Sequence, residues 1–150
     1  MLQSRPSRLA RPVATVLVVE DDEDLRDLVV DTLRRDGYVV LAASSAEEAE
    51  DVLEERAHRI DLVLSDVHMP GRLDGVAVAQ LLRATCPCTP LILMTAFPEP
   101  TLHVAAADVR ALVLSKPFRL EVLRSAVLKA IAAAHVKAFG TRARDGQIPS

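Results

Sequence analysis

The sequence predicts one α/β domain in which five parallel strands alternate with five helices. Five short apolar runs, rich in Val, Ile and Leu, are too brief for helices and stop at polar residues or turn signals. Between them lie segments whose apolar residues recur at the spacing of one helix face. Because strands and helices alternate in this way from residue 13 to residue 137, we expect a parallel sheet with helices on both faces.

The central predicted strand is residues 60–66, Ile-Asp-Leu-Val-Leu-Ser-Asp. This run has the composition of a strand buried on both faces, it ends in Asp66, and the turn residues Met69-Pro70-Gly71 follow it. The other four strands are predicted at residues 13–19, 38–43, 90–95 and 111–115. With this spacing of elements, the flavodoxin-like strand order 2-1-3-4-5 is expected.

The predicted helices carry start and stop signals. Acids at residues 22–24 cap the first helix and Gly37 ends it, while Ser44 or Ser45 caps the second. The remaining three helices are expected from Asp74-Gly75 to Pro87, from the region of Pro98 and Pro100 onward with only a thin apolar face, and from Arg119 to about Lys137.

Length and composition fit one folded domain with two flanking segments. Of the 150 residues, 50% are hydrophobic and 26% are charged, which is enough apolar material for one core. We expect a disordered basic arm at residues 1–12, the folded domain at residues 13–137 and a polar tail at residues 138–150. Cys86 and Cys88, on either side of Pro87, lack the further ligands of a zinc site, so we expect two unremarkable thiols.

Several functional classes are disfavoured by the composition. The net charge of −3 gives no overall attraction to nucleic acid, and 3% aromatic residues without Trp cannot build a base-stacking platform. No apolar run approaches the roughly 20 residues that span a bilayer, and the chain start lacks the apolar region of a secretory signal. We therefore expect a cytoplasmic protein with no membrane contact.

Polar side chains stand where the predicted strands end. The first strand is followed by Asp21 and Asp22, the third ends in Asp66, the fourth in Thr95, and the fifth is followed by Lys116. The carboxyl ends of parallel strands meet at one edge of the sheet, where such folds bind ligands. Asp21 and Asp22 taken alone also fit a helix N-cap, but packing does not explain the whole set.

This combination of side chains indicates phosphoryl transfer. Three carboxylates placed together repel one another unless a cation offsets their charge, and an all-oxygen site with few protein ligands suits Mg²⁺. Lys116 adds a positive charge and Thr95 a hydroxyl donor. A nucleophilic carboxylate, a divalent cation, a lysine and a hydroxyl are the parts that hold a phosphoryl group in transfer, so the sequence predicts an aspartyl phosphate on Asp66.

At this point the sequence resembles the response-regulator receiver domains of two-component systems. The resemblance covers roughly residues 13–137. It is carried by five fragments in order, namely Val18-Val19-Glu20-Asp21-Asp22, Asp66-Val67-His68-Met69-Pro70, Asp74-Gly75, Thr95-Ala96 and Ser115-Lys116-Pro117-Phe118. The chemotaxis member of this family has the flavodoxin-like strand order, so the resemblance implies the same topology.

The resemblance implies a role for each matching residue. Asp66 would be the phosphoacceptor, and Lys116 and Thr95 would contact the phosphoryl group. Asp22 and Asp66 would bind Mg²⁺ directly, Asp21 through water, and the backbone carbonyl of His68 would complete the protein ligands. The family's pattern also suggests a cis peptide bond between Lys116 and Pro117.

The implied partners are proteins. A histidine kinase or phosphotransfer protein would supply the phosphoryl group, and a downstream protein target would bind the face formed around strands four and five. We expect no direct contact with DNA, because only about a dozen residues follow the last predicted helix. The domain would catalyse only its own phosphorylation and dephosphorylation.

Three positions depart from the family's pattern. Val113 stands three residues before Lys116, where the family often has the Tyr or Phe that reorients on phosphorylation. The segment from Met69 to Gly75 is one residue longer than the commonest spacing. Phe97 stands two residues after Thr95, where many relatives are polar, and its ring could limit attacking water and prolong the phosphorylated state.

Three other functions fit parts of the sequence. A pseudo-receiver that binds partners without phosphorylation gains some support from Val113. A phosphatase of the haloacid dehalogenase kind also forms an aspartyl phosphate, but it needs a second Asp where this chain has His68. A flavodoxin would need a phosphate-binding Ser/Thr/Gly loop after the first strand, which this sequence lacks.

Overall fold

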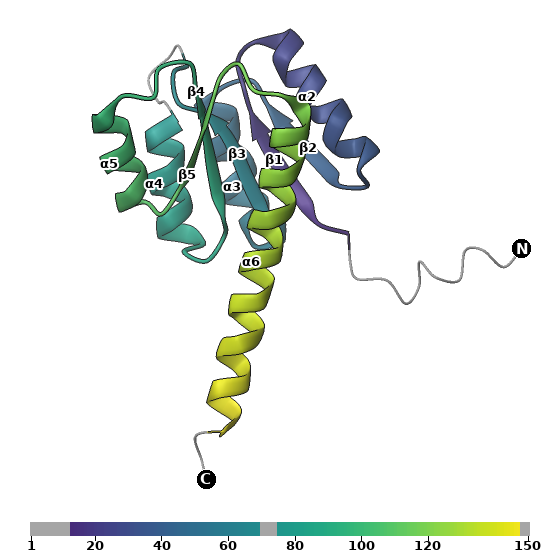
Figure 1. The fold of residues 1–150 in the computed structure, drawn as a ribbon, viewed down its shortest axis with the longest axis vertical. Coiled ribbons are helices and arrows are strands. Elements are labelled where there is room, and N and C mark those ends of the chain that lie inside the picture. Colours follow the sequence, from purple (N-terminus) through teal and green to yellow (C-terminus); the bar gives the residue numbers. More distant parts are fainter. Residues whose placement is uncertain (1–12, 70–74, 148–150) are drawn as a thin grey trace, which may run out of the picture.

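The computed structural model describes residues 13–69 and 75–147, and these residues contain a five-stranded parallel sheet (Figure 1). The strands are β1 (Thr15–Val19), β2 (Val39–Ala43), β3 (Leu62–Asp66), β4 (Leu91–Thr95) and β5 (Leu112–Ser115). Their order is β2-β1-β3-β4-β5, and every neighbouring pair is parallel. The predicted α/β class and strand order are therefore confirmed. The expected basic arm at residues 1–12 and the longer loop at residues 70–74 lie outside the described residues.

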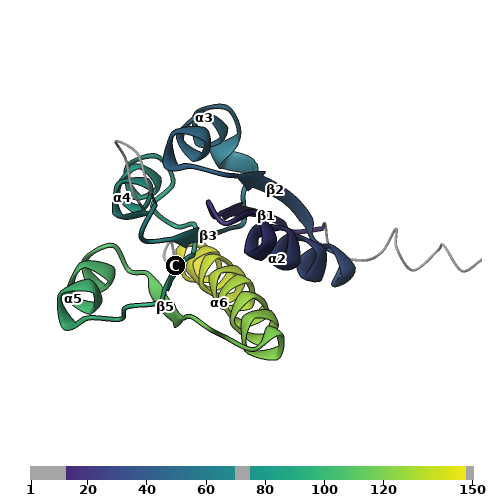
Figure 2. The same ribbon diagram turned by 90° about the horizontal axis from the view of Figure 1, so that it is seen from above.

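Helices cover both faces of the sheet. They are α2 (Glu23–Arg35), α3 (Ala46–Arg56), α4 (Gly75–Thr85), α5 (Pro100–Asp108) and α6 (Leu120–Gln147), with a short 3₁₀ turn, η2 (Ala57–Arg59), after α3. Seen from above, α2 and α6 lie on one side of the sheet and α3 and α4 on the other, where α5 also lies, next to β5 (Figure 2). This is the arrangement expected when strand and helix alternate along the chain.

The core consists of two apolar layers, one on each face of the sheet. All five residues of β3 and all five of β4 are buried. Side chains alternate along a strand, so Leu62 and Leu64 pack with α2 and α6, while Val63 packs with α3 and α4. The last residue of β3, Asp66, therefore stands at the edge of a rigid and fully covered strand.

Helix α6 is longer than the sequence suggested. We expected it to end near Lys137, with a polar tail from residue 138, but the helix continues to Gln147 (Figure 1). The error came from treating Gly140 as a stop. A single Gly costs a helix only about 1 kcal/mol, and the residues around it are mostly Ala, Lys and Arg, which favour helix.

Helix α5 has the thin apolar face that its sequence predicts. Only Ala106 of this helix is buried, while Val104 is 65% exposed. Pro100 occupies its first turn, where a missing N–H costs nothing. Helix α5 is thus held to the sheet by few contacts.

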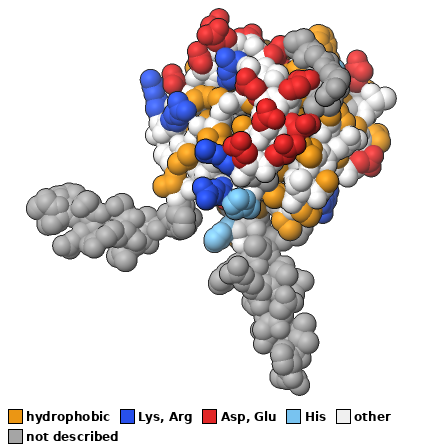
Figure 3. All heavy atoms as spheres, turned by 180° about the vertical axis from the view of Figure 1, so that it is seen from behind, with side chains coloured by type: hydrophobic (Ala, Val, Ile, Leu, Met, Phe, Trp, Pro, Cys, Tyr) orange, Lys and Arg blue, Asp and Glu red, His pale blue; other side chains and the backbone are white. Residues whose placement is uncertain are grey.

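The outer side of α3 is acidic. Six of its eleven residues are Asp or Glu, and the view from behind shows acidic side chains gathered over this face (Figure 3). Its apolar side, Ala46, Ala49 and Leu53, is buried against the sheet. No helix within the described ranges is long and apolar enough to cross a membrane.

Candidate functional site

The carboxyl edge of the sheet brings together side chains that are far apart in the sequence. Asp66 ends β3, Thr95 ends β4, Glu20 directly follows β1, and Lys116 directly follows β5. Glu20 and Thr95 are fully buried, and Asp66 is 5% exposed. The strands place these polar groups at the end of the sheet, where their side chains meet beyond the apolar core.

Lys116 links two of the carboxylates. Its Nζ lies 2.7 Å from Oε1 of Glu20 and 3.3 Å from Oδ1 of Asp66. The main-chain N–H of Lys116 also donates to the carbonyl of Thr95 at 2.7 Å, which continues the β4–β5 pairing into the site. Lys116 thus pairs with Glu20 and Asp66 at the same time.

Burial and the contact between Glu20 and Lys116 together shift the pKa values of both residues. Burial raises the pKa of Glu20 to about 7, although the hydrogen bonds from Lys116 and from the Asp22 N–H act in the opposite direction. Burial also opposes the charged form of Lys116, but its hydrogen bond to Glu20 and the charges of both acids outweigh burial and raise the pKa of Lys116. Burial thus favours the protonated form of Glu20, and the neighbouring acids favour the charged form of Lys116.

Three acids can bind a cation together. Carboxylate oxygens of Glu20, Asp21 and Asp66 all lie within 4.8 Å of one another. Carboxylate oxygens are the ligands that hard divalent cations such as Mg²⁺ prefer, and a bound cation would offset the desolvation that raises the pKa of Glu20. The residues present therefore fit the cation that the sequence predicts.

Asp22 does not belong to this acidic group. It is exposed and forms the N-cap of α2, where its Oδ1 accepts a hydrogen bond from the Leu25 N–H at 3.1 Å. We expected Asp22 to be a direct ligand and did not single out Glu20. The end of β1 indicates which acids lie nearest to the sheet. The strand ends at Val19, and Glu20 and Asp21 are the first two residues beyond it.

His68 stands beside the Asp66 carboxylate, and Phe97 lies next to His68. The His68 N–H points to Oδ1 of Asp66 at 3.4 Å, and its ring meets the ring of Phe97 edge-on at 6.2 Å between centroids. The Phe97 N–H donates to the hydroxyl oxygen of Thr95 at 3.0 Å, while its ring is 65% exposed. The cation role predicted for the His68 carbonyl stays a prediction.

Helix α4 begins directly against Asp66. The Gly75 N–H donates to the carbonyl of Val67 at 3.1 Å, and a Cβ at Gly75 would overlap the carbonyl oxygen of Asp66. That same oxygen accepts a hydrogen bond from the hydroxyl of Ser65 at 3.0 Å. The peptide of Asp66 is therefore enclosed on the side of α4.

Two of the expectations from the family pattern concern β5. The peptide bond between Lys116 and Pro117 is cis, as expected. Val113, which occupies the position of the frequent aromatic residue, is partly buried against the core layer under α4.

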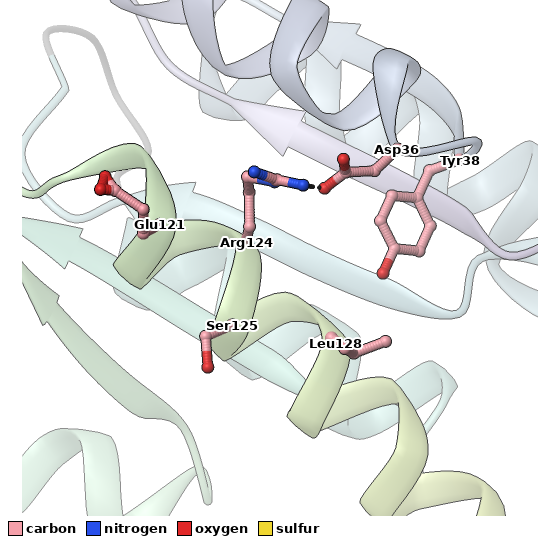
Figure 4. Close-up of a pocket in the computed structure, with 6 residues that line it drawn as sticks. All are labelled: Asp36, Tyr38, Glu121, Arg124, Ser125 and Leu128. Carbon is pink, nitrogen blue, oxygen red and sulfur yellow. Dashed lines mark hydrogen bonds and ion pairs between the residues drawn. The ribbon is translucent and has the colours of Figure 1, made fainter.

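A separate groove of about 390 Å³ lies between the end of α2 and the first turns of α6 (Figure 4). It is lined by Asp36, Tyr38, Glu121, Arg124, Ser125 and Leu128, and Arg124 donates to Asp36 across it at 2.9 Å. Glu20, Asp21 and Asp66, the acids that lie together within the described part of the chain, do not line this groove.

Known proteins match both the sequence and the fold. The family model described as "response regulator receiver domain" matches residues 16–128. The response regulator protein FleR of Pseudomonas aeruginosa is 41% identical over 121 residues, and the sensor kinase CckA of Brucella abortus is 37% identical over 115 residues. These matches cover 77% and 76% of this chain but only 24% and 12% of the relatives' own lengths.

A solved structure supports the same assignment. The chemotaxis protein CheY4 of Vibrio cholerae is 30% identical, with a TM-score of 0.73, and the match covers 79% of this chain and 99% of that protein.

Proposed function

The chain belongs to the response-regulator receiver family of two-component signalling, and we propose that it accepts a phosphoryl group on Asp66 with the help of Mg²⁺. The observation that supports this proposal best is the convergence of Asp66, Lys116 and the acids after β1 at one edge of the sheet. Phosphorylation would then change how the domain binds a downstream protein.

In the proposed reaction, a carboxylate oxygen of Asp66 attacks the phosphorus of a phosphohistidine. The new P–O bond forms as the P–N bond breaks, and the electron pair of the P–N bond stays on the imidazole, which leaves as the neutral ring because its other nitrogen carries a proton. Lys116, already 3.3 Å from Asp66, stabilises the negative charge on the phosphoryl oxygens, and the Thr95 hydroxyl donates a hydrogen bond to one of them. The position of Asp66, Thr95 and Lys116 at one edge of the sheet and the chemistry of their side chains support these roles.

Glu20, Asp21 and Asp66 would hold the cation, with the His68 carbonyl as a further ligand. When bound, Mg²⁺ supplies positive charge that lowers the repulsion between the acceptor carboxylate and the incoming phosphoryl group. This assignment replaces Asp22 by Glu20 in the predicted ligand set, because the side chain of Asp22 caps α2.

The proposed partners are proteins in the cytoplasm. A histidine kinase or phosphotransfer protein would donate the phosphoryl group, and the face around β4, α5 and β5 would contact the target. Phe97 in the loop after β4, Val104 of α5 and Leu112 of β5 are all more than half exposed, which supports a protein-binding surface there. The acidic outer side of α3 is unsuited to the phosphates of DNA.

Intact-mass analysis of the full chain after incubation with a small phosphodonor tests the proposal. We expect one added phosphoryl group in the presence of Mg²⁺ and none in Asp66→Asn, which keeps the shape of the side chain but removes its nucleophilic oxygen. Absence of an adduct with any donor would reject the proposal in favour of a phosphorylation-independent pseudo-receiver, to which Val113 gives some support. Continuous release of phosphate would instead indicate a phosphatase, although His68 stands where that chemistry needs an acid.

A further inference from the structure

We propose that Arg26 of α2 is a positioning residue that holds the turn at residues 20–22 in the shape required for cation binding. The inference rests on the proposed function, because it concerns the same acidic site. Arg26 itself is separate from the three acids that can bind the cation. It acts through the backbone that carries two of them, Glu20 and Asp21.

The contact that supports the inference is a hydrogen bond between a side chain and the main chain. Nη1 of Arg26 donates to the carbonyl oxygen of Glu20 at 2.9 Å. The Glu20 N–H still belongs to the sheet, since it donates to Ala43 of β2 at 3.0 Å. Its carbonyl lies at the point where the chain leaves the sheet for α2, so Arg26 holds the chain where the regular pairing ends.

Arg26 also contacts the other end of the same turn. Its main-chain N–H donates to the carbonyl of Asp22 at 2.9 Å, and its side chain reaches back toward the N-terminus of the helix, as helical side chains do. Arg26 therefore binds the residue before Asp21 and the residue after it. Asp21 is exposed, so its own packing fixes it weakly, and these two flanking contacts restrain its backbone.

Two further hydrogen bonds complete the turn. Oε2 of Glu20 accepts from the Asp22 N–H at 3.1 Å, and Oδ1 of Asp22 accepts from Leu25. These bonds link the acids of the turn to the start of α2, and the guanidinium of Arg26 closes the set by linking α2 back to β1. Loss of that link frees the Glu20 carbonyl and lets the turn adopt other shapes.

Charge and position predict opposite effects when Arg26 is removed. Arg26 is a cation close to an acidic turn, so by charge alone its replacement with Gln should strengthen Mg²⁺ binding. If Arg26 positions the turn, the same replacement should weaken binding, because the carboxylates are no longer held in one arrangement. The sign of the change therefore separates the two explanations.

Arg34 provides a matched control on the same helix. Its Nη2 donates to the carbonyl of Val40 at 3.1 Å, so Arg34→Gln removes the same charge and the same kind of hydrogen bond at the opposite end of α2. The test measures the Mg²⁺ dissociation constant of the full chain from the amide resonances of residues 20–22, and thermal unfolding of each variant.

We expect Arg26→Gln to weaken Mg²⁺ binding about tenfold, the lower end of the range for residues that orient metal ligands. The Arg34→Gln variant should bind Mg²⁺ as tightly as the wild type, although it should lose about as much stability as Arg26→Gln. The Arg26→Lys variant can still donate to Glu20 and should recover most of the Mg²⁺ affinity. Equal or tighter Mg²⁺ binding in Arg26→Gln would overturn the inference. The Mg²⁺ titration uses no phosphodonor, so it is independent of the intact-mass experiment. If the wild-type protein binds Mg²⁺ but gains no phosphoryl group in the intact-mass experiment, the proposed function is rejected and the role of Arg26 is not.

Discussion

The ammonium group of Lys116 donates a 2.7 Å hydrogen bond to Oε1 of Glu20, a carboxylate whose side chain is 1% exposed. The same ammonium lies 3.3 Å from Asp66, so the lysine is shared between a structural partner and the proposed phosphoacceptor. A phosphoryl group on Asp66 would offer Lys116 additional negative charge. The hydrogen bond to Glu20 holds the ammonium group of Lys116 at the site before Asp66 is phosphorylated.

The first prediction concerns the pH dependence of stability without a cation. The folded-state pKa of Glu20, about 7, is above its ordinary value of 4.5, so folding favours the protonated acid. Its stabilising contribution is complete below about pH 4.5 and is lost as the pH rises through 7. Between pH 5 and pH 8, wild-type protein should therefore lose on the order of 2 kcal/mol more unfolding free energy than Glu20→Gln, as measured by urea titration.

Mg²⁺ provides the control for this measurement. A bound cation favours the charged carboxylate, so saturating Mg²⁺ should make the two pH profiles more alike. Parallel profiles of wild type and Glu20→Gln in the absence of any divalent cation would show that Glu20 titrates normally.

The second prediction compares two glycines that are required for different reasons. A Cβ at Gly75 would overlap the Asp66 carbonyl oxygen and lie 2.8 Å from Cα of Val67, and backbone atoms cannot move aside easily. Gly75→Ala should therefore cost about 3 kcal/mol or more of unfolding free energy and slow phosphorylation of Asp66. Urea unfolding and the rate of mass gain measure the two effects.

Gly37→Ala is the matched control. Gly37 ends α2 with φ +98° and has no atom within 4 Å of the added Cβ, so the cost comes only from the left-handed backbone and should be about 1 kcal/mol. Its phosphorylation rate should equal that of the wild type. A Gly75→Ala protein that is phosphorylated as fast as Gly37→Ala would show that α4 does not constrain the acceptor.

The third prediction concerns the lifetime of the phosphorylated state. The Phe97 ring meets the His68 ring beside Asp66, where it can restrict the approach of water. Phe97→Ala should shorten the lifetime several-fold, as followed by loss of the phosphoryl mass over time. Val104→Ala, which removes an equally exposed apolar side chain from α5, should leave the lifetime unchanged. Equal decay in the two variants would contradict a role for the ring.

The fold could be predicted from the sequence because its signals are local and agree with one another. The apolar runs that became β3 and β4 are buried along their whole length, and Asp22 and Gly37 mark the ends of α2. The end of α6 could not be predicted in this way. A glycine is a permissive residue, so Gly140 signals a helix end only where other residues also disfavour helix.

The candidate site was predicted less completely than the fold. Asp66, Thr95 and Lys116 could be singled out because each stands at or just after the end of a strand whose limits are clear, and their roles stay predictions. Among three consecutive acids, however, a difference of one residue decides which carboxylate enters the site and which caps the helix. Glu20 was missed although the predicted strand and β1 both end at Val19, because the sequence pattern does not show which of the following acids turns its side chain into the site. The proposed role of Arg26 depends on a contact that no local pattern reveals.

The last prediction tests that one-residue difference directly. Since a ligand that binds only the folded state stabilises it, Mg²⁺ should raise the unfolding temperature of the wild type. Asp21→Asn removes a carboxylate of the acidic group and should abolish most of this increase. Asp22→Ala removes the N-cap of α2 and should cost about 1 kcal/mol, yet keep the response to Mg²⁺. Asp22→Asn keeps the cap and should behave like the wild type in both respects. Loss of the Mg²⁺ response in Asp22→Asn would instead restore Asp22 as a ligand, because that substitution changes the charge of the side chain and leaves its capping oxygen in place.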